Sequence, residues 1–229
     1  MATSFLATSD LEAAVIDHVA RYRLTVVEAL QTQPALAQPG SDQLKQILKQ
    51  LCRQGVLDNA TLYLDRSYFY LAPMLPTEGR KLLSESVKIR RYAMLAFCCL
   101  GATPRTRLLP TECEAHCPEL YHAVGCLDFY VSDSTANRAL GVLRVDSGGR
   151  GRWDRVLEKC RRDIIRLQMD RQVRAMIDDG QLEYTLVTAL PQKVHRLQQA
   201  IVCWSDIPLG VMRLCAVPDL VNLIAPSPY

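Results

Sequence analysis

Residues 41–71 decide the fold, and they read SDQLKQILKQLCRQGVLDNATLYLDRSYFYL. In the first half, apolar residues recur at i, i+3, i+4 and i+7, a spacing that places them on one side of a helix. They are Leu44, Ile47, Leu48 and Leu51. Ser41 suits the residue that caps the start of a helix, and Gly55 suits the left-handed residue that ends one. The stretch therefore predicts an amphipathic helix that stops at a glycine.

The other side of this helix carries long polar and basic side chains with no carboxylate among them: Gln43, Lys45, Gln46, Lys49, Gln50 and Arg53. After the glycine, the β-prone runs TLYL and YFYL are joined by a short polar turn at residues 65–67, which predicts a two-stranded hairpin. A helix with such a face, followed by a hairpin, is typical of a winged helix-turn-helix, which presents its recognition helix to the major groove of DNA.

Two further helical segments precede this stretch. Residues 11–22, LEAAVIDHVARY, carry an apolar stripe made of Leu11, Val15, Ile16 and Val19. In the next segment, Thr25 and Glu28 have the spacing of a capping box. We therefore predict a winged-helix DNA-binding domain over residues 1–75, and the alternative is a generic helical bundle edge with a hairpin.

The second half predicts a different kind of domain. A helix over residues 80–100 has a basic first half and an apolar second half, which suits either burial or a dimer interface. A loop-rich region follows to residue 121, and then β-prone runs alternate with helices of a dozen or more residues. This alternation indicates an α/β domain over residues 80–229, with a mixed sheet flanked by helices.

Composition bounds the class of protein. The net charge of +3 is too small to require nucleic acid by itself, so the distribution of charge matters more than its sum. The nine cysteines are odd in number and several lie in apolar helical runs, which fits free thiols better than a disulfide framework. The first 22 residues lack the features of a signal peptide, and the apolar stretch YAMLAFCCLGA is too short to span a bilayer. We expect a cytoplasmic protein with no membrane contact.

Four segments carry a resemblance to a known family: RLTVVEALQ, LKQLCRQGVLDN, LDFYVSD and LGVLRVDSGG. With these segments in this order, the chain resembles the bacterial replication-relaxation family, in which a winged helix precedes a degraded PD-(D/E)xK nuclease-like domain. The resemblance implies a DNA-binding protein whose restriction-endonuclease-like α/β domain has lost its activity.

The nuclease-like resemblance points to a few residues. In active members, two acids from neighbouring strands hold Mg²⁺ and a lysine polarises the attacking water. Here Asp128 takes the first place, but the triplet reads Arg144-Val145-Asp146. We expect Arg144 to pair with Asp128 where a metal would sit, and we predict no catalytic residue, metal or cofactor. The alternative is a Mg²⁺-dependent nuclease in which Asp128 and Asp146 converge.

Two other clusters remain open. The glycine-rich loop of residues 148–152 opens a basic helix, and its Arg150 and Arg152 suit a phosphate clasp. In that helix, spacings such as Glu158 to Arg162 indicate a solvated, salt-bridged face. A further group has ligand types that zinc accepts, but its spacing matches no known zinc module, so coincidence is the preferred interpretation; its members are Cys113, His116, Cys117, His122 and Cys126.

The sequence therefore predicts a protein that binds double-stranded DNA, with no small-molecule substrate identified. Gln43, Gln46 and Gln50 are expected at base edges, because an amide pairs bidentately with adenine. Phosphate contacts are expected from the cations of the helix and from Arg66 at the tip of the wing; the helix cations are Lys45, Lys49 and Arg53. The alternative is a protein-interaction module that dimerises through the apolar end of helix 80–100 and binds no DNA. A homodimer is expected from the symmetry habits of such regulators.

Overall fold

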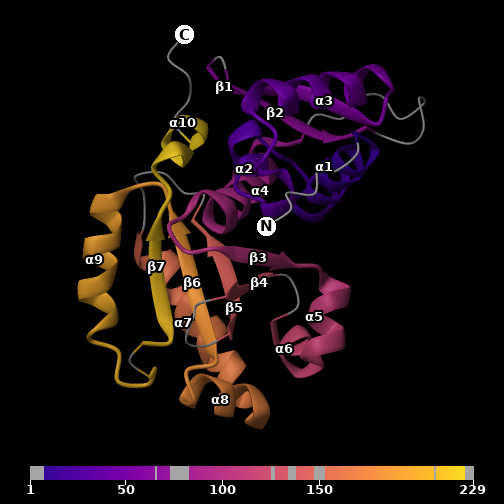
Figure 1. The fold of residues 1–229 in the computed structure, drawn as a ribbon. Coiled ribbons are helices and arrows are strands. Elements are labelled where there is room, and N and C mark those ends of the chain that lie inside the picture. The colour runs from indigo at the N-terminus through magenta and orange to yellow at the C-terminus, as the bar shows by residue number, and fades with distance from the viewer. Residues whose placement is uncertain are drawn as a thin grey trace. The chain divides into compact units, whose positions relative to one another are not determined.

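The chain folds as a mixed α/β protein, described by a computed structural model over residues 8–64, 66–72, 83–124, 127–133, 138–146, 153–208 and 210–224. It divides into two compact units, Met1–Leu100 and Gly101–Tyr229 (Figure 1). The boundary differs from the expected one because helix 85–100 goes with the first unit. No helix in the described ranges combines the length and the apolar character that crossing a bilayer requires.

The first unit contains four α-helices, a 3-10 turn, a hairpin and a π-helical turn among its described residues. In chain order they are α1 Thr8–Tyr22, α2 Val27–Gln31, η1 Pro34–Leu36, α3 Ser41–Arg53, β1 Leu57–Tyr63, β2 Arg66–Leu71, α4 Glu85–Leu95 and η2 Ala96–Leu100. Strands β1 and β2 pair antiparallel from Leu57 opposite Leu71 to Tyr63 opposite Arg66. The hairpin and the helix before it therefore form where the sequence places them.

The core of this unit is built on the predicted stripe of α3. Leu44, Ile47, Leu48 and Leu51 are all buried, and they cluster with Leu11, Val15 and Val19 of α1. Ile16 packs against this cluster only partly buried. At the end of α3 the predicted glycine cap is confirmed. Gly55 has a φ of 73°, its N–H donates to Cys52 O, and the N–H of Val56 donates to Leu51 O.

Thr25 does not cap a helix as its spacing to Glu28 predicted. Its N–H donates to Phe69 O at 2.8 Å and its C=O accepts from Phe69 N at 2.9 Å, so it forms a bridge on the edge of β2. Helix α2 begins after Val26 without a side-chain cap. Ser41 likewise does not cap α3, because the N-cap position falls on Gly40. The bridge adds a third, very short strand to the hairpin.

The second unit is an open five-stranded sheet with helices. Its strands run in the order β3-β4-β5-β6-β7, where β3, β4 and β5 are antiparallel neighbours and β5, β6 and β7 are parallel neighbours. Its elements are β3 Arg105–Leu108, α5 Pro110–His116, α6 Pro118–Val124, β4 Asp128–Asp133, β5 Arg138–Val145, α7 Trp153–Met169, α8 Arg171–Asp178, β6 Leu182–Thr188, α9 Pro191–Ile201, β7 Met212–Ala216, η3 Pro218–Leu220 and α10 Val221–Ile224.

The alternation of strands with helices after residue 127 matches the prediction, and two details differ. The region expected to be loop-rich contains a strand and two short helices, β3, α5 and α6. The long basic helix is broken at Asp170, whose carboxylate accepts from the N–H groups of Gln172 at 2.8 Å and Val173 at 3.1 Å. An aspartate in that position starts a new helix, and the chain therefore turns from α7 into α8.

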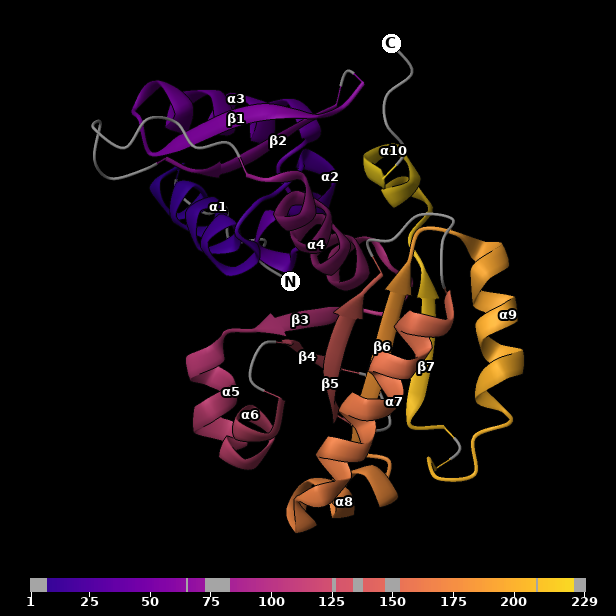
Figure 2. The ribbon, with the colours of Figure 1, turned by 180° about the vertical axis from the view of Figure 1, so that it is seen from behind.

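One face of the sheet carries the helices of this unit. Residues on alternate positions of the strands, such as Phe129, Val142 and Tyr184, share a single core with side chains from α5 to α9. Helix α7 is seen in front of the sheet in Figure 2. The buried helix residues in this core include Cys113, Leu120, Leu157, Cys160, Ile164, Val173 and Leu197.

On the opposite face of the sheet, a buried tyrosine ring packs against a glycine of the neighbouring strand. Tyr130 of β4 lies opposite Gly141 of β5, and a Cβ atom built on Gly141 would sit 2.0 Å from Cζ of Tyr130. The hydroxyl of Tyr130 donates to Glu183 Oε1 at 2.6 Å and is also 2.6 Å from Thr185 Oγ1. Two polar side chains therefore hold the hydroxyl of Tyr130, and the missing side chain of Gly141 leaves room for the ring.

We expect Gly141→Ala to lower the free energy of unfolding of the second unit by about 1–3 kcal/mol, because the added methyl group collides with a ring that is fully buried. Urea denaturation measures the change. In a protein that already carries Tyr130→Leu, Gly141→Ala should cost less, since the ring atoms that collide with the methyl group are gone. Additive costs of the two substitutions in the double-mutant cycle would contradict the explanation.

His18 is buried in the first unit beside Cys99. Its Nε2 lies 3.8 Å from Cys99 Sγ, and its ring centroid is 4.8 Å from that of Tyr22. Burial, helped by the positive charge of Arg21, lowers the pKa of His18 to about 4. The folded chain therefore holds this imidazole neutral at pH values where an unfolded chain would already protonate it.

From this shift we expect stability to fall as the pH drops from about 6.5 to about 4, because in this window the unfolded chain takes up a proton that the folded chain does not. The full loss from this group is about 3 kcal/mol. Thermal or urea unfolding at a series of pH values tests it. His18→Gln should flatten the dependence, whereas His195→Gln, on the exposed part of α9, should leave it in place.

Candidate nucleic-acid interface

The side of α3 turned away from the core is open. All six predicted residues are exposed, and we call them the outward face: Gln43, Lys45, Gln46, Lys49, Gln50 and Arg53. At 100° per residue, Gln43, Gln46, Gln50 and Arg53 form one row, and Lys45 and Lys49 form a second row beside it. The buried apolar stripe of α3 faces the core and therefore fixes the direction of both rows.

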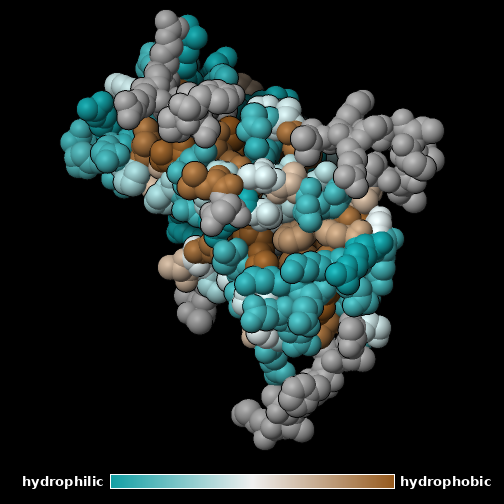
Figure 3. Space-filling view, turned by 90° about the horizontal axis from the view of Figure 1, so that it is seen from above, coloured by the Kyte–Doolittle hydropathy of each residue, from teal (hydrophilic) through white to brown (hydrophobic). Residues whose placement is uncertain are grey.

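Two carboxylates lie close to this face. Gln50 Nε2 donates to Glu12 Oε1 of α1 at 2.8 Å, and Lys45 Nζ lies 3.4 Å from Asp42 Oδ1 in the first turn of the helix. Both contacts are exposed to solvent, where such pairs contribute little. Within the described ranges, Lys49 and Arg53 form no ion pair. On the side seen in Figure 3, teal and pale side chains make up most of the coloured surface.

Arg66 lies directly after the turn of the hairpin, but it is not an available cation. It begins β2, and its guanidinium donates to the Tyr63 hydroxyl at 2.5 Å and to the Tyr92 hydroxyl at 3.3 Å. It also forms an ion pair with Glu28 Oε1 at 3.1 Å, and only 25% of its side chain is exposed. Leu64 lies at the turn instead, 80% exposed and with a φ of 50°. The role of Arg66 is to join the hairpin to α2 and α4.

The other cations predicted for phosphate, Arg150 and Arg152, lie outside the described residues.

The two acids of the nuclease alternative lie on opposite faces of the sheet. Asp128 is opposite Leu143 in the antiparallel pairing of β4 and β5, so its side chain shares a face with Leu143 and Val145. Arg144 and Asp146 alternate with those residues and point to the helix-covered face. The two carboxylates therefore do not converge on one cation.

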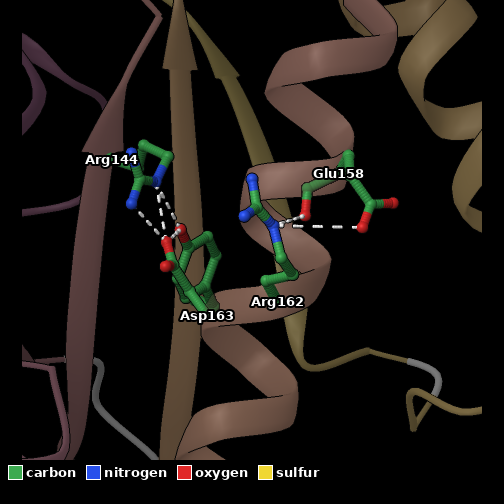
Figure 4. A network of polar contacts seen from close by, with 5 residues as sticks. Arg144, Glu158, Arg162 and Asp163 are labelled. Carbon is green, nitrogen blue, oxygen red and sulfur yellow. Dashed lines mark hydrogen bonds and ion pairs between the residues drawn. The ribbon is translucent and has the colours of Figure 1, made fainter.

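Asp128 is paired with a cation, but not with the one that the sequence predicted. Asp128 Oδ1 accepts from Arg107 of β3 at 3.0 Å, not from Arg144 as expected. Arg144 instead donates to Asp163 Oδ2 of α7 at 2.5 Å, and its Nε lies 2.9 Å from the Tyr184 hydroxyl (Figure 4). The expected ion pair is therefore wrong. It assumed that neighbouring strands bring Asp128 and Arg144 to one face, whereas the register separates them.

Asp146 lies at the end of β5, where it is almost fully buried. Its Oδ2 accepts a hydrogen bond from Lys193 Nζ of α9 and lies 3.3 Å from Thr188 Oγ1. This buried pair joins the end of the sheet to the start of α9. Removing one partner of such a pair is costly because the remaining charge is left without compensation.

The cysteines and histidines whose types zinc accepts differ in their exposure. Cys113 and Cys117 belong to the buried core, whereas His116 and His122 are exposed, and Cys126 lies outside the described residues. Burial, with a further contribution from Cys117, raises the pKa of the Cys113 thiol to about 12, which disfavours the thiolate that zinc binds. In the part of the chain that the structure describes, no three His, Cys, Asp or Glu residues are placed to hold a metal ion.

Sequence reasoning missed Glu12 and Glu28 as neighbours of the predicted interface. Both contacts join α3 or β2 to helices far along the chain, and no local spacing reports them. One signal was available for Arg66: an arginine next to aromatic residues beside a hairpin turn suits stacking, and Arg66 lies 5.7 Å from the centroid of Tyr63.

We expect Arg66→Gln to lower the free energy of unfolding of the first unit by about 2 kcal/mol, because it breaks charge-assisted hydrogen bonds and leaves Tyr63, Tyr92 and Glu28 without this partner. Urea denaturation measures the loss. The matched control is Arg53→Gln on the exposed side of α3, for which the change should stay within about 0.5 kcal/mol. Equal effects of the two substitutions would contradict the structural role of Arg66.

Comparison with known proteins gives this chain no family: no family model, no curated protein and no solved structure matches it.

Proposed function

We propose that this protein binds double-stranded DNA through the outward face of α3, with its first unit acting as a winged helix. The order of elements supports this proposal, because α1, the Thr25 bridge, α2, α3 and the hairpin follow one another as the elements of a winged helix do. The observation that carries the proposal is the exposed face itself, in which three amides and three cations stand clear of the core.

The two rows of the outward face suit different parts of a duplex. An amide side chain pairs bidentately with adenine, so the row of Gln43, Gln46 and Gln50 suits base edges in the major groove. Lys45 and Lys49 flank that row and suit the phosphates along the groove. Gln50 must leave Glu12 to reach a base, and because that contact is exposed, breaking it costs little.

The hairpin has a smaller part in this proposal than the sequence suggested. Arg66 is held by Glu28, Tyr63 and Tyr92, so we assign it to the structure of the first unit and not to DNA. The hairpin then supports α3 from one side, since Leu57 joins the same core as the α3 stripe.

For the second unit we propose a non-catalytic scaffold related to the nuclease-like fold, as in the replication-relaxation family. Three antiparallel strands followed by a helical crossover to a parallel strand support the likeness. A nuclease that uses Asp128 and Asp146 receives no support, because these acids lie on opposite faces and are paired with Arg107 and Lys193.

The rival function, a protein-interaction module, loses its main surface. Side chains from Tyr92 to Cys99 on α4 and η2 are buried, and only Leu100 at the end of the segment reaches 36% exposure. Dimerisation stays a prediction, which light scattering of the purified protein tests.

Lys45→Glu combined with Lys49→Glu should weaken binding to duplex DNA at least about tenfold and reduce the slope of log K against log salt by about 1.8, since two phosphate contacts are lost. Fluorescence anisotropy at salt concentrations between about 50 and about 200 mM measures both. As a matched comparison, Lys49→Glu alone should weaken binding, and Arg196→Glu, the same type of change at an exposed cation of α9, should not. Binding that is absent, or that does not depend on salt, refutes the proposal.

A further inference from the structure

The exposed side of α7 carries a regular stripe of cations. Its members follow one another at intervals of four, three and four residues, and we call them the basic stripe: Arg155, Lys159, Arg162 and Arg166. At 100° per residue they fall within a narrow sector of the helix. At a rise of 1.5 Å per residue they extend over about 16 Å.

The stripe lies opposite the buried side of the helix. Leu157, Cys160, Ile164 and Leu167 face the core, and the four cations lie about 150° around the helix from them and are all exposed. Position 163 falls on a flank, where Asp163 is turned to Arg144 on the sheet (Figure 4). The core and this ion pair together fix which side of α7 faces water.

Most charges of α7 outside the stripe are already compensated. Asp163 pairs with Arg144, and Arg161 pairs with Asp206 at 2.8 Å. Within the stripe, Arg162 lies 3.9 Å from Glu158 in an exposed contact. In the described ranges no ion pair is formed by Arg155, Lys159 or Arg166. The stripe therefore keeps a net positive charge directed to solvent, which the overall balance of +3 does not reveal.

We infer that the basic stripe of α7 is a second contact surface for double-stranded DNA, which binds the phosphate backbone without reading sequence. The inference rests on the proposed function in taking duplex DNA as the ligand. A row of guanidinium and ammonium groups at one charge per turn is complementary to the closely spaced charges of a duplex. Arginine, which supplies three of the four groups, binds phosphate oxygens bidentately. Contacts to phosphate position a protein on the duplex but carry no sequence information directly, so a stripe that binds the backbone supplies affinity and not specificity.

The test compares two full-length variants with the unaltered protein. In the α7 variant, Arg155, Lys159, Arg162 and Arg166 are each changed to Gln, and in the α3 variant, Lys45, Lys49 and Arg53 are each changed to Gln. Glutamine is chosen because it favours helix nearly as well as the residues it replaces, and circular dichroism confirms that both variants fold. Each protein is titrated with a labelled duplex of random sequence at several salt concentrations.

For the α7 variant we expect the slope of log K against log salt to become shallower by about 3.6, which corresponds to four lost phosphate contacts. A single substitution, Arg166→Gln, should reduce the slope by about 0.9, and Arg196→Gln on α9 serves as its matched control and should leave the slope unchanged. An unchanged slope in the α7 variant, with weaker binding by the α3 variant, overturns this inference and leaves the proposed function in place.

The remaining outcomes are also decisive. Weaker binding by the α7 variant alone supports the stripe and refutes the role of α3, and failure of the unaltered protein to bind duplex DNA refutes both. Polyglutamate is the competitor that separates nucleic acid from an acidic protein partner. If the α7 variant loses binding to polyglutamate and keeps its full affinity and slope for DNA, the stripe is a protein-binding surface and the inference is wrong.

Discussion

The burial of one stripe of α3 determines what the first unit presents to its surroundings. Leu44, Ile47, Leu48 and Leu51 together contribute on the order of 6–12 kcal/mol of hydrophobic free energy, and that burial is possible in only one rotation of the helix. The Schellman cap at Gly55 then ends the helix and directs the chain into β1. Because the apolar stripe of α3 is turned to the core, the amides and cations of the outward face are turned to solvent.

Both units contain charged residues of two kinds, those paired between elements and cations exposed on the outer side of a helix. In the sheet of the second unit, carboxylates and arginines or lysines neutralise each other at close range, as in Asp128 with Arg107 and Arg144 with Asp163. On α3 and on the outer side of α7, cations remain largely uncompensated. The paired charges hold elements together, and the unpaired ones add to the positive potential at the surface.

Much of the first unit followed from local patterns in the sequence. The 3.6-residue period of α3, the glycine at its end and the β-prone runs of the hairpin are signals within a few residues, and all three were correct. Thr25 shows where such signals fail. The spacing to Glu28 indicated a cap, but a strand edge far along the chain offered Thr25 two backbone hydrogen bonds, and that tertiary contact prevailed.

The errors in the second unit have one physical origin. Whether Asp128 meets Arg144 or Arg107 depends on the register of neighbouring strands, because a shift of one residue moves a side chain to the other face. The loop lengths between these strands do not fix that register. The short elements β3, α5 and α6 were missed for a related reason, as four to seven residues hold too little periodicity to be recognised.

The order of the sheet in the second unit has a consequence for small molecules. Open α/β sheets bind nucleotides where the order of strands reverses, because the connections on either side diverge there and leave a crevice at the strand ends. The sheet described here runs β3-β4-β5-β6-β7 without a reversal, and α5 to α9 join one core on a single face. At the carboxyl end of β5, the buried Asp146–Lys193 pair joins the sheet to α9. In the part of the chain that the structure describes, the sheet therefore lacks the change of strand order at which such sites form.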